Sequence, residues 1–136
     1  MFALDAQLQR DCFVLGRLEF CQLLLMNNAG VPWFILVPET ALAEPFDLDA
    51  SRQALLQAEI NAVASFVRES FGTDKLNIAT IGNIVSQLHV HVVGRRKNDY
   101  CWPGVVWGTV PPERYTDEQL AQIRTNVARK LKGFEA

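Results

Sequence analysis

The sequence predicts an α+β domain in which antiparallel strands, gathered into hairpins, are accompanied by two helices. Short apolar runs separated by turn residues indicate the strands, and two longer segments whose apolar residues recur every three or four positions indicate the helices. The strands do not alternate regularly with helices, so a parallel βαβ unit is not expected. The 136 residues suit a single domain spanning 1–136, and 49% hydrophobic residues are enough for a substantial core.

Five segments are predicted as strands. The first three cover residues 12–18, 21–26 and 33–37, and the turn residues Asn-Asn-Ala-Gly at 27–30 predict a hairpin between the second and the third. The last two cover residues 76–81 and 87–93. We expect them to pair around a turn at Gly82-Asn83.

Two helices follow from capping residues and apolar spacing. The first is long, with Asp47 or Asp49 as its N-cap and Gly72 in the left-handed conformation just past its end. Its apolar stripe comprises Leu48, Leu55, Leu56, Ile60, Val63 and Val67. The second opens with a capping box formed by Thr116 and Gln119. Its inward residues are Leu120, Ile123, Val127 and Leu131.

Composition excludes several classes of partner. A net charge of −2 and a pI near 5.6 argue against a surface for bulk nucleic acid, although a single nucleotide remains compatible. No apolar run reaches the ~18 residues that span a bilayer, and the first ten residues do not form a signal peptide. We therefore expect a soluble cytoplasmic protein. Cys12, Cys21 and Cys101 lack the spacing of a disulfide framework or a zinc site, so reduced thiols are expected.

The chain has only two histidines, and both lie in the run Gln87-Leu88-His89-Val90-His91. A strand repeats every two residues, so His89 and His91 are expected to project from one face beside the amide of Gln87, opposite an apolar face. Imidazole is the side chain whose ordinary pKa lies nearest neutrality. Its concentration on one strand face predicts a functional site.

The segment around these histidines resembles the signature of the histidine triad (HIT) superfamily of nucleotide hydrolases and transferases. In that family a polar segment, here beginning at Gly82, leads into a strand with histidines at three alternate positions. Aligned on this pattern, the second histidine is His89, the third is His91 and the first is replaced by Gln87. Ile84 stands where the family has a serine or threonine near the leaving group.

The resemblance implies a HIT-like fold: a roughly five-stranded antiparallel sheet, one long helix packed on it and a C-terminal helix. It implies a homodimer that needs no cofactor and acts on a small nucleotide substrate, and we favour a dinucleoside polyphosphate such as diadenosine tetraphosphate. His89 would attack the α-phosphorus, while His91 would donate to a phosphate oxygen or to the departing oxygen. Gln87 completes the expected catalytic set, and the expected nucleotide-binding residues are Asn27, Asn77, Gly82, Asn83 and Trp102.

Other interpretations stay open at this point. A HIT-like module could bind nucleotide without turnover, or His89 and His91 could ligate a metal that Asp, Glu or Cys side chains complete. The asparagines could instead serve as turn residues that bond their own backbone. The segment from Trp102 to Trp107 could pack into the core or, as Trp-Pro segments do in branches of the family, reach a partner's site. The basic run at 94–97 could contact phosphate or be a solvated strand end.

Overall fold

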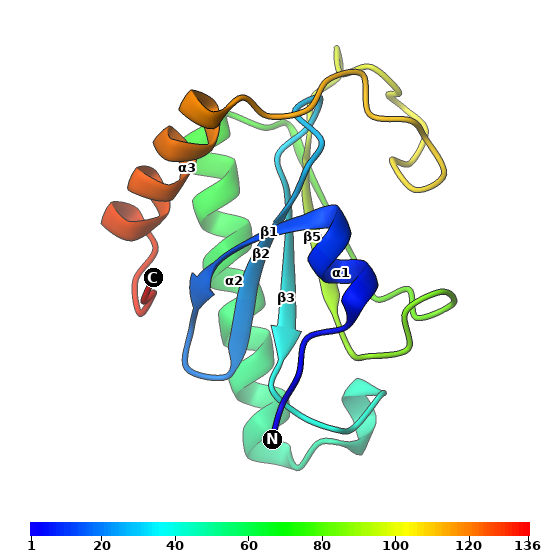
Figure 1. Ribbon diagram of the computed structural model, residues 1–136, viewed down its shortest axis with the longest axis vertical. Coiled ribbons are helices and arrows are strands. Elements are labelled where there is room, and N and C mark those ends of the chain that lie inside the picture. Colours follow the sequence, from blue (N-terminus) through cyan, green and yellow to red (C-terminus); the bar gives the residue numbers. More distant parts are fainter.

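The computed structural model describes residues 1–136 and consists of one antiparallel sheet with helices on both faces (Figure 1). The elements in chain order are α1 (Ala6–Asp11), β1 (Cys12–Arg17), β2 (Cys21–Met26), β3 (Trp33–Pro38), the 3-10 turn η1 (Pro45–Asp47), α2 (Ala50–Phe71), β4 (Lys75–Ala79), β5 (Val90–Arg95) and α3 (Asp117–Lys130). The strand order is β1-β2-β3-β5-β4. The predicted α+β class with a five-stranded antiparallel sheet is confirmed. None of the helices is both long and apolar enough to cross a lipid bilayer.

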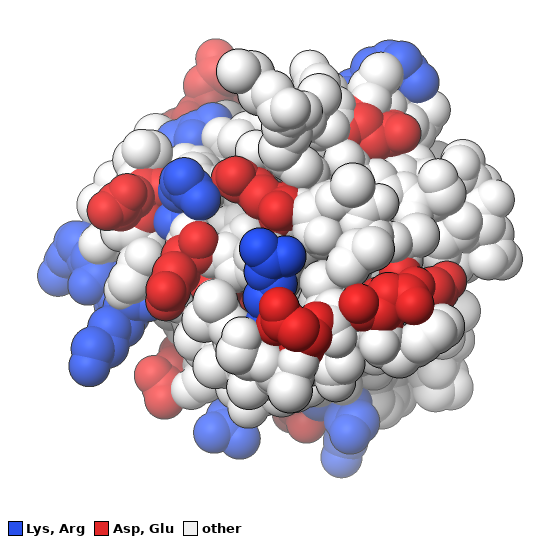
Figure 2. Space-filling view, turned by 90° about the horizontal axis from the view of Figure 1, so that it is seen from below, with Lys and Arg blue, Asp and Glu red and all other residues white.

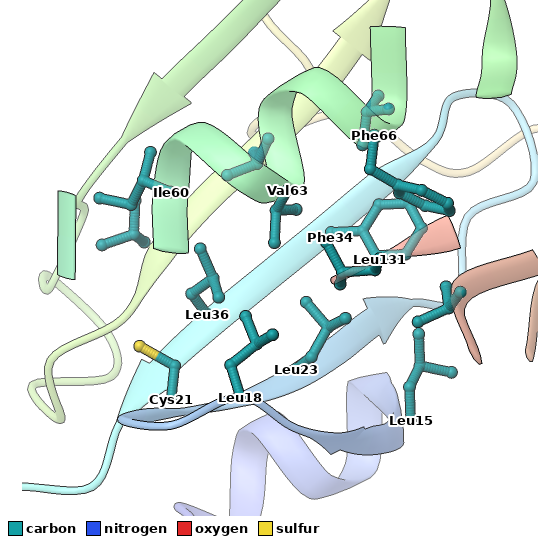
Figure 3. Close-up of a cluster of buried hydrophobic side chains, with 14 of the residues drawn as sticks. Leu15, Leu18, Cys21, Leu23, Phe34, Leu36, Ile60, Val63, Phe66 and Leu131 are labelled. Atoms are coloured by element: carbon teal, nitrogen blue, oxygen red, sulfur yellow. The ribbon is translucent and has the colours of Figure 1, made fainter. Parts of the chain in front are cut away.

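Helix α2 covers one face of the sheet and forms the larger core. Its capping residues are those predicted: the Asp49 carboxylate accepts the N–H of Arg52, and Gly72 ends the helix at φ 59°. Asp47 belongs instead to η1. Figure 3 shows the apolar side chains of α2 packed onto those of the strands. Labelled residues of this core are Leu15, Leu18, Cys21, Leu23, Phe34, Leu36, Ile60, Val63, Phe66 and Leu131.

A buried carboxylate lies within the apolar face of α2. Glu59 is only 6% exposed, and its two carboxylate oxygens accept the N–H groups of Phe20 and Cys21 at 2.9 and 3.0 Å. These N–H groups lie where the chain turns into β2. A buried carboxylate is tolerated only when it is hydrogen-bonded, so Glu59 ties the β1–β2 hairpin to the helix.

The opposite face of the sheet has its own, smaller core. It contains Leu8 of α1, apolar residues of β3 including Trp33, and Val106 of the loop that follows β5. Helix α1 was not predicted, because six residues are too short to show an apolar period. Asp5 caps it by accepting the N–H of Gln7.

The connection between β4 and β5 differs from the predicted tight turn at Gly82-Asn83. Strand β4 ends at Ala79 and β5 begins at Val90, so residues 80–89 form a loop and 87–89 are not in the strand. The last pair of this ladder joins Ala79 to His91. Beyond that pair, the Gln87 side chain bonds to the N-terminal backbone, and the chain before β5 leaves the sheet.

Candidate active site

The two histidines meet at the start of β5, on the sheet face away from α2. His91 is in the strand and His89 precedes it, with ring centroids 4.9 Å apart and planes inclined at 71°. Leu88, Val90 and Val92 belong to the core under α2, as the alternation predicted. Each histidine is only 5% exposed. The pair is therefore embedded in the sheet, and the surrounding structure fixes which ring nitrogens can react.

The tautomer of His89 follows from one hydrogen bond. Its Nδ1 atom lies 2.7 Å from the backbone carbonyl oxygen of Gln87. A carbonyl oxygen only accepts, so Nδ1 must carry the proton. In the neutral ring the lone pair is then on Nε2, which is the arrangement that a nucleophilic imidazole requires.

The tautomer of His91 is the opposite one. The indole N–H of Trp33 lies 3.0 Å from Nδ1 of His91. An indole nitrogen only donates, so Nδ1 of His91 must present a lone pair and the proton of the neutral ring is on Nε2. The two rings thus present different groups at their Nε2 atoms: a lone pair on His89 and an N–H on His91.

Burial keeps His91 neutral. Removal from water, together with the nearby ring of His89, lowers the pKa of His91 from 6.5 to about 4. Two tryptophans supply the desolvation, because Trp33 and Trp107 pack edge-on against the imidazole with centroids 5.7 and 5.3 Å away. At neutral pH His91 is therefore a hydrogen-bond donor without a charge.

The Nε2 atoms of both histidines make no hydrogen bond within the protein. Neither belongs to the fully buried side-chain atoms that lack a partner, which are Ser70 Oγ, Thr73 Oγ1 and Trp107 Nε1. Each Nε2 atom therefore keeps access to solvent. Both are available to a ligand.

A cavity of about 270 Å³ opens beside His89. Its lining brings together four of the predicted site residues, namely Gly82, Asn83, Gln87 and His89. The remaining lining residues are Ala43, Glu44, Thr80, Ser86 and Leu88. No lysine or arginine lines it, so an anionic ligand there would be held by N–H and O–H donors. Ser86 and Thr80 were not predicted, since hydroxyl residues in a loop carry no distinctive spacing.

Gln87 holds a backbone segment and has little capacity left for a ligand. Its Oε1 accepts the N–H of Asp5, and its Nε2 donates to the carbonyl of Ala3, both at 2.9 Å. The residue at the first triad position therefore clamps the N-terminal segment against the loop before β5. Ile84, at the position where the family has a serine or threonine, is 92% exposed and has no hydroxyl to donate.

Three of the predicted nucleotide-binding residues lie away from this cavity. Asn27 follows the far end of β2, and its Oδ1 accepts the N–H of Tyr115. Asn77 accepts a hydrogen bond from Arg95, and Trp102 lies over the same guanidinium with its ring centroid 5.5 Å away. These side chains hold loops of the fold and do not line the cavity beside His89, and a role for them in nucleotide binding stays a prediction.

Both arginines of the basic run at 94–97 have partners within the fold. Arg95 is 2% exposed and donates two hydrogen bonds to Asp99, at 2.8 and 3.0 Å. Arg96 donates to the carbonyl of Phe71, and the backbone N–H of Lys97 donates to Asp74. Burial alone would raise the pKa of Asp99, but the hydrogen bonds from Arg95 and from the backbone N–H groups of Arg96 and Cys101, together with the guanidinium charge, lower it overall. The pair is a structural ion pair.

Trp107, in the loop that follows β5, contacts the histidine pair. Trp107 packs on both His91 and Trp33, and its indole N–H is buried without a partner. The sequence singled out the segment from Trp102 to Trp107, with Trp102 as the nucleotide-binding candidate, and it is Trp107 that contacts His91. No group of three or more His, Cys, Asp or Glu side chains lies close enough to hold a metal ion.

Two imidazoles at the start of β5, which lies between β3 and β4 in a five-stranded antiparallel sheet, are the arrangement expected of a histidine triad protein. A HIT domain family model matches residues 7–98, and the chain belongs to this family.

Solved structures agree over nearly the whole length. A histidine triad protein from Sinorhizobium meliloti 1021 is 42% identical, with a TM-score of 0.92 over 96% of this chain and 98% of that one. One from Marinobacter aquaeolei VT8 is 40% identical, with a TM-score of 0.93 over 99% of both chains. One from Bradyrhizobium japonicum is 37% identical, with a TM-score of 0.92 over 96% and 98%. No curated protein sequence matches the chain.

Proposed function

We propose that this protein is a nucleotide hydrolase or transferase that cleaves at the α-phosphorus of a nucleotide derivative through a covalent intermediate on His89. A dinucleoside polyphosphate such as diadenosine tetraphosphate is the substrate that we favour. The observation that carries the proposal is the 2.7 Å hydrogen bond from Nδ1 of His89 to the Gln87 carbonyl, because it leaves the Nε2 lone pair for attack.

The proposed reaction has two balanced steps. In the first, the Nε2 lone pair of His89 forms a bond to the α-phosphorus while the bond from phosphorus to the bridging oxygen breaks, and that oxygen leaves with the electron pair. The ring gains positive charge, which the Gln87 carbonyl stabilises through the Nδ1 proton. In the second, water attacks phosphorus, the P–N bond breaks, His89 recovers its lone pair and the water proton passes to solvent.

His91 and the loop before β5 would stabilise the phosphoryl oxygens. The Nε2–H of His91 is a neutral donor beside the nucleophile. Gly82 and Asn83 line the cavity and would contribute backbone N–H groups and an amide. Because no lysine or arginine lines the cavity, we assign the stabilisation of developing charge to these uncharged donors.

The choice of leaving group follows from the two residues that replace the family's hydroxyl and first histidine. Ile84 has no hydroxyl, and the Gln87 amide does not titrate and is already bonded to the N-terminal segment. A departing nucleotide or polyphosphate has a low pKa and leaves without protonation, whereas an alkylamine must be protonated first. We therefore propose that polyphosphate leaving groups are preferred.

We also propose a homodimer. Strand β4 is an edge of the sheet. Its Ile78 is about half exposed, and Phe46 nearby is 75% exposed. Both side chains line a cavity of about 460 Å³. An open edge with apolar residues favours pairing with a second chain. Light scattering of wild type and Ile78→Lys tests this: we expect a dimer that the lysine weakens, and a monomeric wild type would contradict it. A contact of Trp102 with the partner's site stays a prediction.

Turnover and binding are separated by one pair of measurements on the wild-type protein. Product formation from diadenosine tetraphosphate is followed by chromatography, and binding of AMP is followed by calorimetry. We expect both turnover and binding. Binding of AMP without turnover of the dinucleotide or of an adenosine phosphoramidate would show a nucleotide-binding module instead of an enzyme.

A further inference from the structure

We infer that Trp33 is a positioning residue for His91: its indole N–H fixes the ring with the proton on Nε2, so that the site pairs a lone-pair imidazole with a proton-bearing one. The tautomer part of the inference stands on contacts within the protein. Its catalytic consequence rests on the proposed function.

The geometry leaves His91 one arrangement. Trp33 lies on β3, two residues before the direct partner of His91, and its Nε1 atom is 3.0 Å from Nδ1 of His91. Trp33 is 7% exposed and His91 5%, so water does not compete for this contact. A proton on Nδ1 would place two N–H groups against each other in a buried place. The free-energy cost of that clash strongly disfavours the other tautomer, and it opposes a second proton on the ring at neutral pH.

No other group around His91 can set its protonation. The strand neighbours on its face are Ile35 of β3 and Ala79 of β4, and the loop after β5 contributes Trp107. None of these titrates. The only titratable neighbour is His89, whose Nδ1 is bonded to the Gln87 carbonyl. Trp107 contacts the His91 ring without donating to it, since its N–H has no partner.

This arrangement divides two roles between two identical side chains. With their opposite tautomers, Nε2 of His89 can attack phosphorus while Nε2–H of His91 donates to an oxygen of the same group. If His91 took the other tautomer, two lone pairs would face the anionic phosphoryl group and the donor would be lost. Complete loss of a donor of this kind from a reaction site lowers kcat by roughly 10²–10³. In an even mixture of the two tautomers half of the molecules keep the donor, so kcat should fall about twofold.

The test compares Trp33→Phe with the matched control Trp107→Phe. Both remove an aromatic contact of His91 with a similar change in volume, but only the first removes a hydrogen bond. Nitrogen-15 NMR of the histidine rings, without any substrate, shows which nitrogen of His91 carries the proton. We expect a single Nε2–H form in wild type and Trp107→Phe, and a mixture in Trp33→Phe. A backbone spectrum of each variant shows whether it is folded.

A pure Nε2–H form in folded Trp33→Phe, or an Nδ1–H form in wild type, would overturn the inference whether or not the protein is an enzyme. If Trp33→Phe does not fold, the wild-type spectrum alone still decides the tautomer. With diadenosine tetraphosphate, we expect Trp33→Phe to lower kcat about twofold for an even mixture of tautomers, with a smaller change in KM. Unchanged kcat with a mixed tautomer would overturn the catalytic consequence, whereas absent turnover in wild type would contradict the proposed function alone.

Discussion

Polar side chains are buried against tryptophan rings at both ends of β5. The two ends differ in whether the polar atoms have hydrogen-bond partners within the protein. At the end of the strand, Arg95 lies beneath Trp102 and its guanidinium donates to Asp99 and Asn77. At the start, His91 lies against Trp33 and Trp107, and its Nε2, like that of His89, has no partner in the protein.

The difference separates a structural cluster from a reactive one. A buried ion pair whose hydrogen bonds are satisfied holds the loop after β5 in place. The two imidazole rings are each oriented by a hydrogen bond at Nδ1, and their Nε2 atoms remain available to a ligand. From the sequence alone, both ends of the segment could contact phosphate. Acidic and basic side chains are interspersed on the face shown in Figure 2, so charge on that face does not mark a phosphate-binding site.

The largest effect should come from the reactive end. Replacing His89 with Ala or Gln removes the nucleophile, and we expect kcat/KM for diadenosine tetraphosphate to fall by ~10⁴ or more. His89 is buried and bonded to Gln87, so the alanine variant should also lose roughly 1 kcal/mol of unfolding free energy. Steady-state kinetics on the folded variant measures the rate. More than about one percent of the wild-type rate would remove His89 from the nucleophile role.

The structural end should affect stability and not chemistry. Arg95→Met leaves the Asp99 carboxylate buried without its cation, and we expect urea unfolding to show a loss of about 3–5 kcal/mol. The double variant Arg95→Met, Asp99→Leu is the control, since it removes both charges and should recover part of the loss. We expect folded Arg95→Met to keep its kcat. A fall in kcat as large as in the His89 variants would contradict a purely structural role for this end of β5.

The protonation of His91 predicts how stability depends on pH. Its pKa is about 4 in the folded protein and 6.5 ordinarily, so between these values the unfolded chain binds a proton that the folded protein does not. The free energy of unfolding should therefore fall as pH drops from 6.5 to 4, by roughly 3 kcal/mol from this group. Urea unfolding at several pH values measures it, with His91→Gln as the control that lacks this component. Identical pH profiles for the two proteins would contradict a neutral His91.

The smallest effect should come from restoring the family pattern on the leaving-group side. Ile84→Ser places a hydroxyl at an exposed position, and we expect kcat/KM for an adenosine phosphoramidate to rise up to about tenfold relative to diadenosine tetraphosphate. Gln87→His adds a titratable donor but releases the segment at Ala3 and Asp5, so its gain should be smaller. A wild-type preference for the phosphoramidate would show that another group protonates the leaving nitrogen.

Local signals explain what could be predicted from the sequence. The capping box at Thr116 and Gln119, the cap at Asp49 and the left-handed Gly72 were all predicted, because each depends on residues a few positions apart. The face of the histidines was predicted for the same reason.

Contacts between distant segments explain what could not. Trp33 and His91 are 58 positions apart, and Gln87 and Ala3 are 84 apart. Neither pair has a spacing that a local pattern could reveal. Asn77 was expected at the nucleotide site from the family resemblance, and its hydrogen bond from Arg95, 18 positions away, has no local signal either.

The central claim is that Nε2 of His89 forms a bond to phosphorus, and trapping that bond tests it most directly. Wild type and His89→Gln are mixed with diadenosine tetraphosphate, quenched within the first turnover at alkaline pH, digested and analysed by mass spectrometry. We predict one adenylyl group on the peptide that contains His89, at a position that fragmentation assigns to that residue, and none in the variant. Turnover with no adduct under these conditions, or an adduct on His91, would contradict the account.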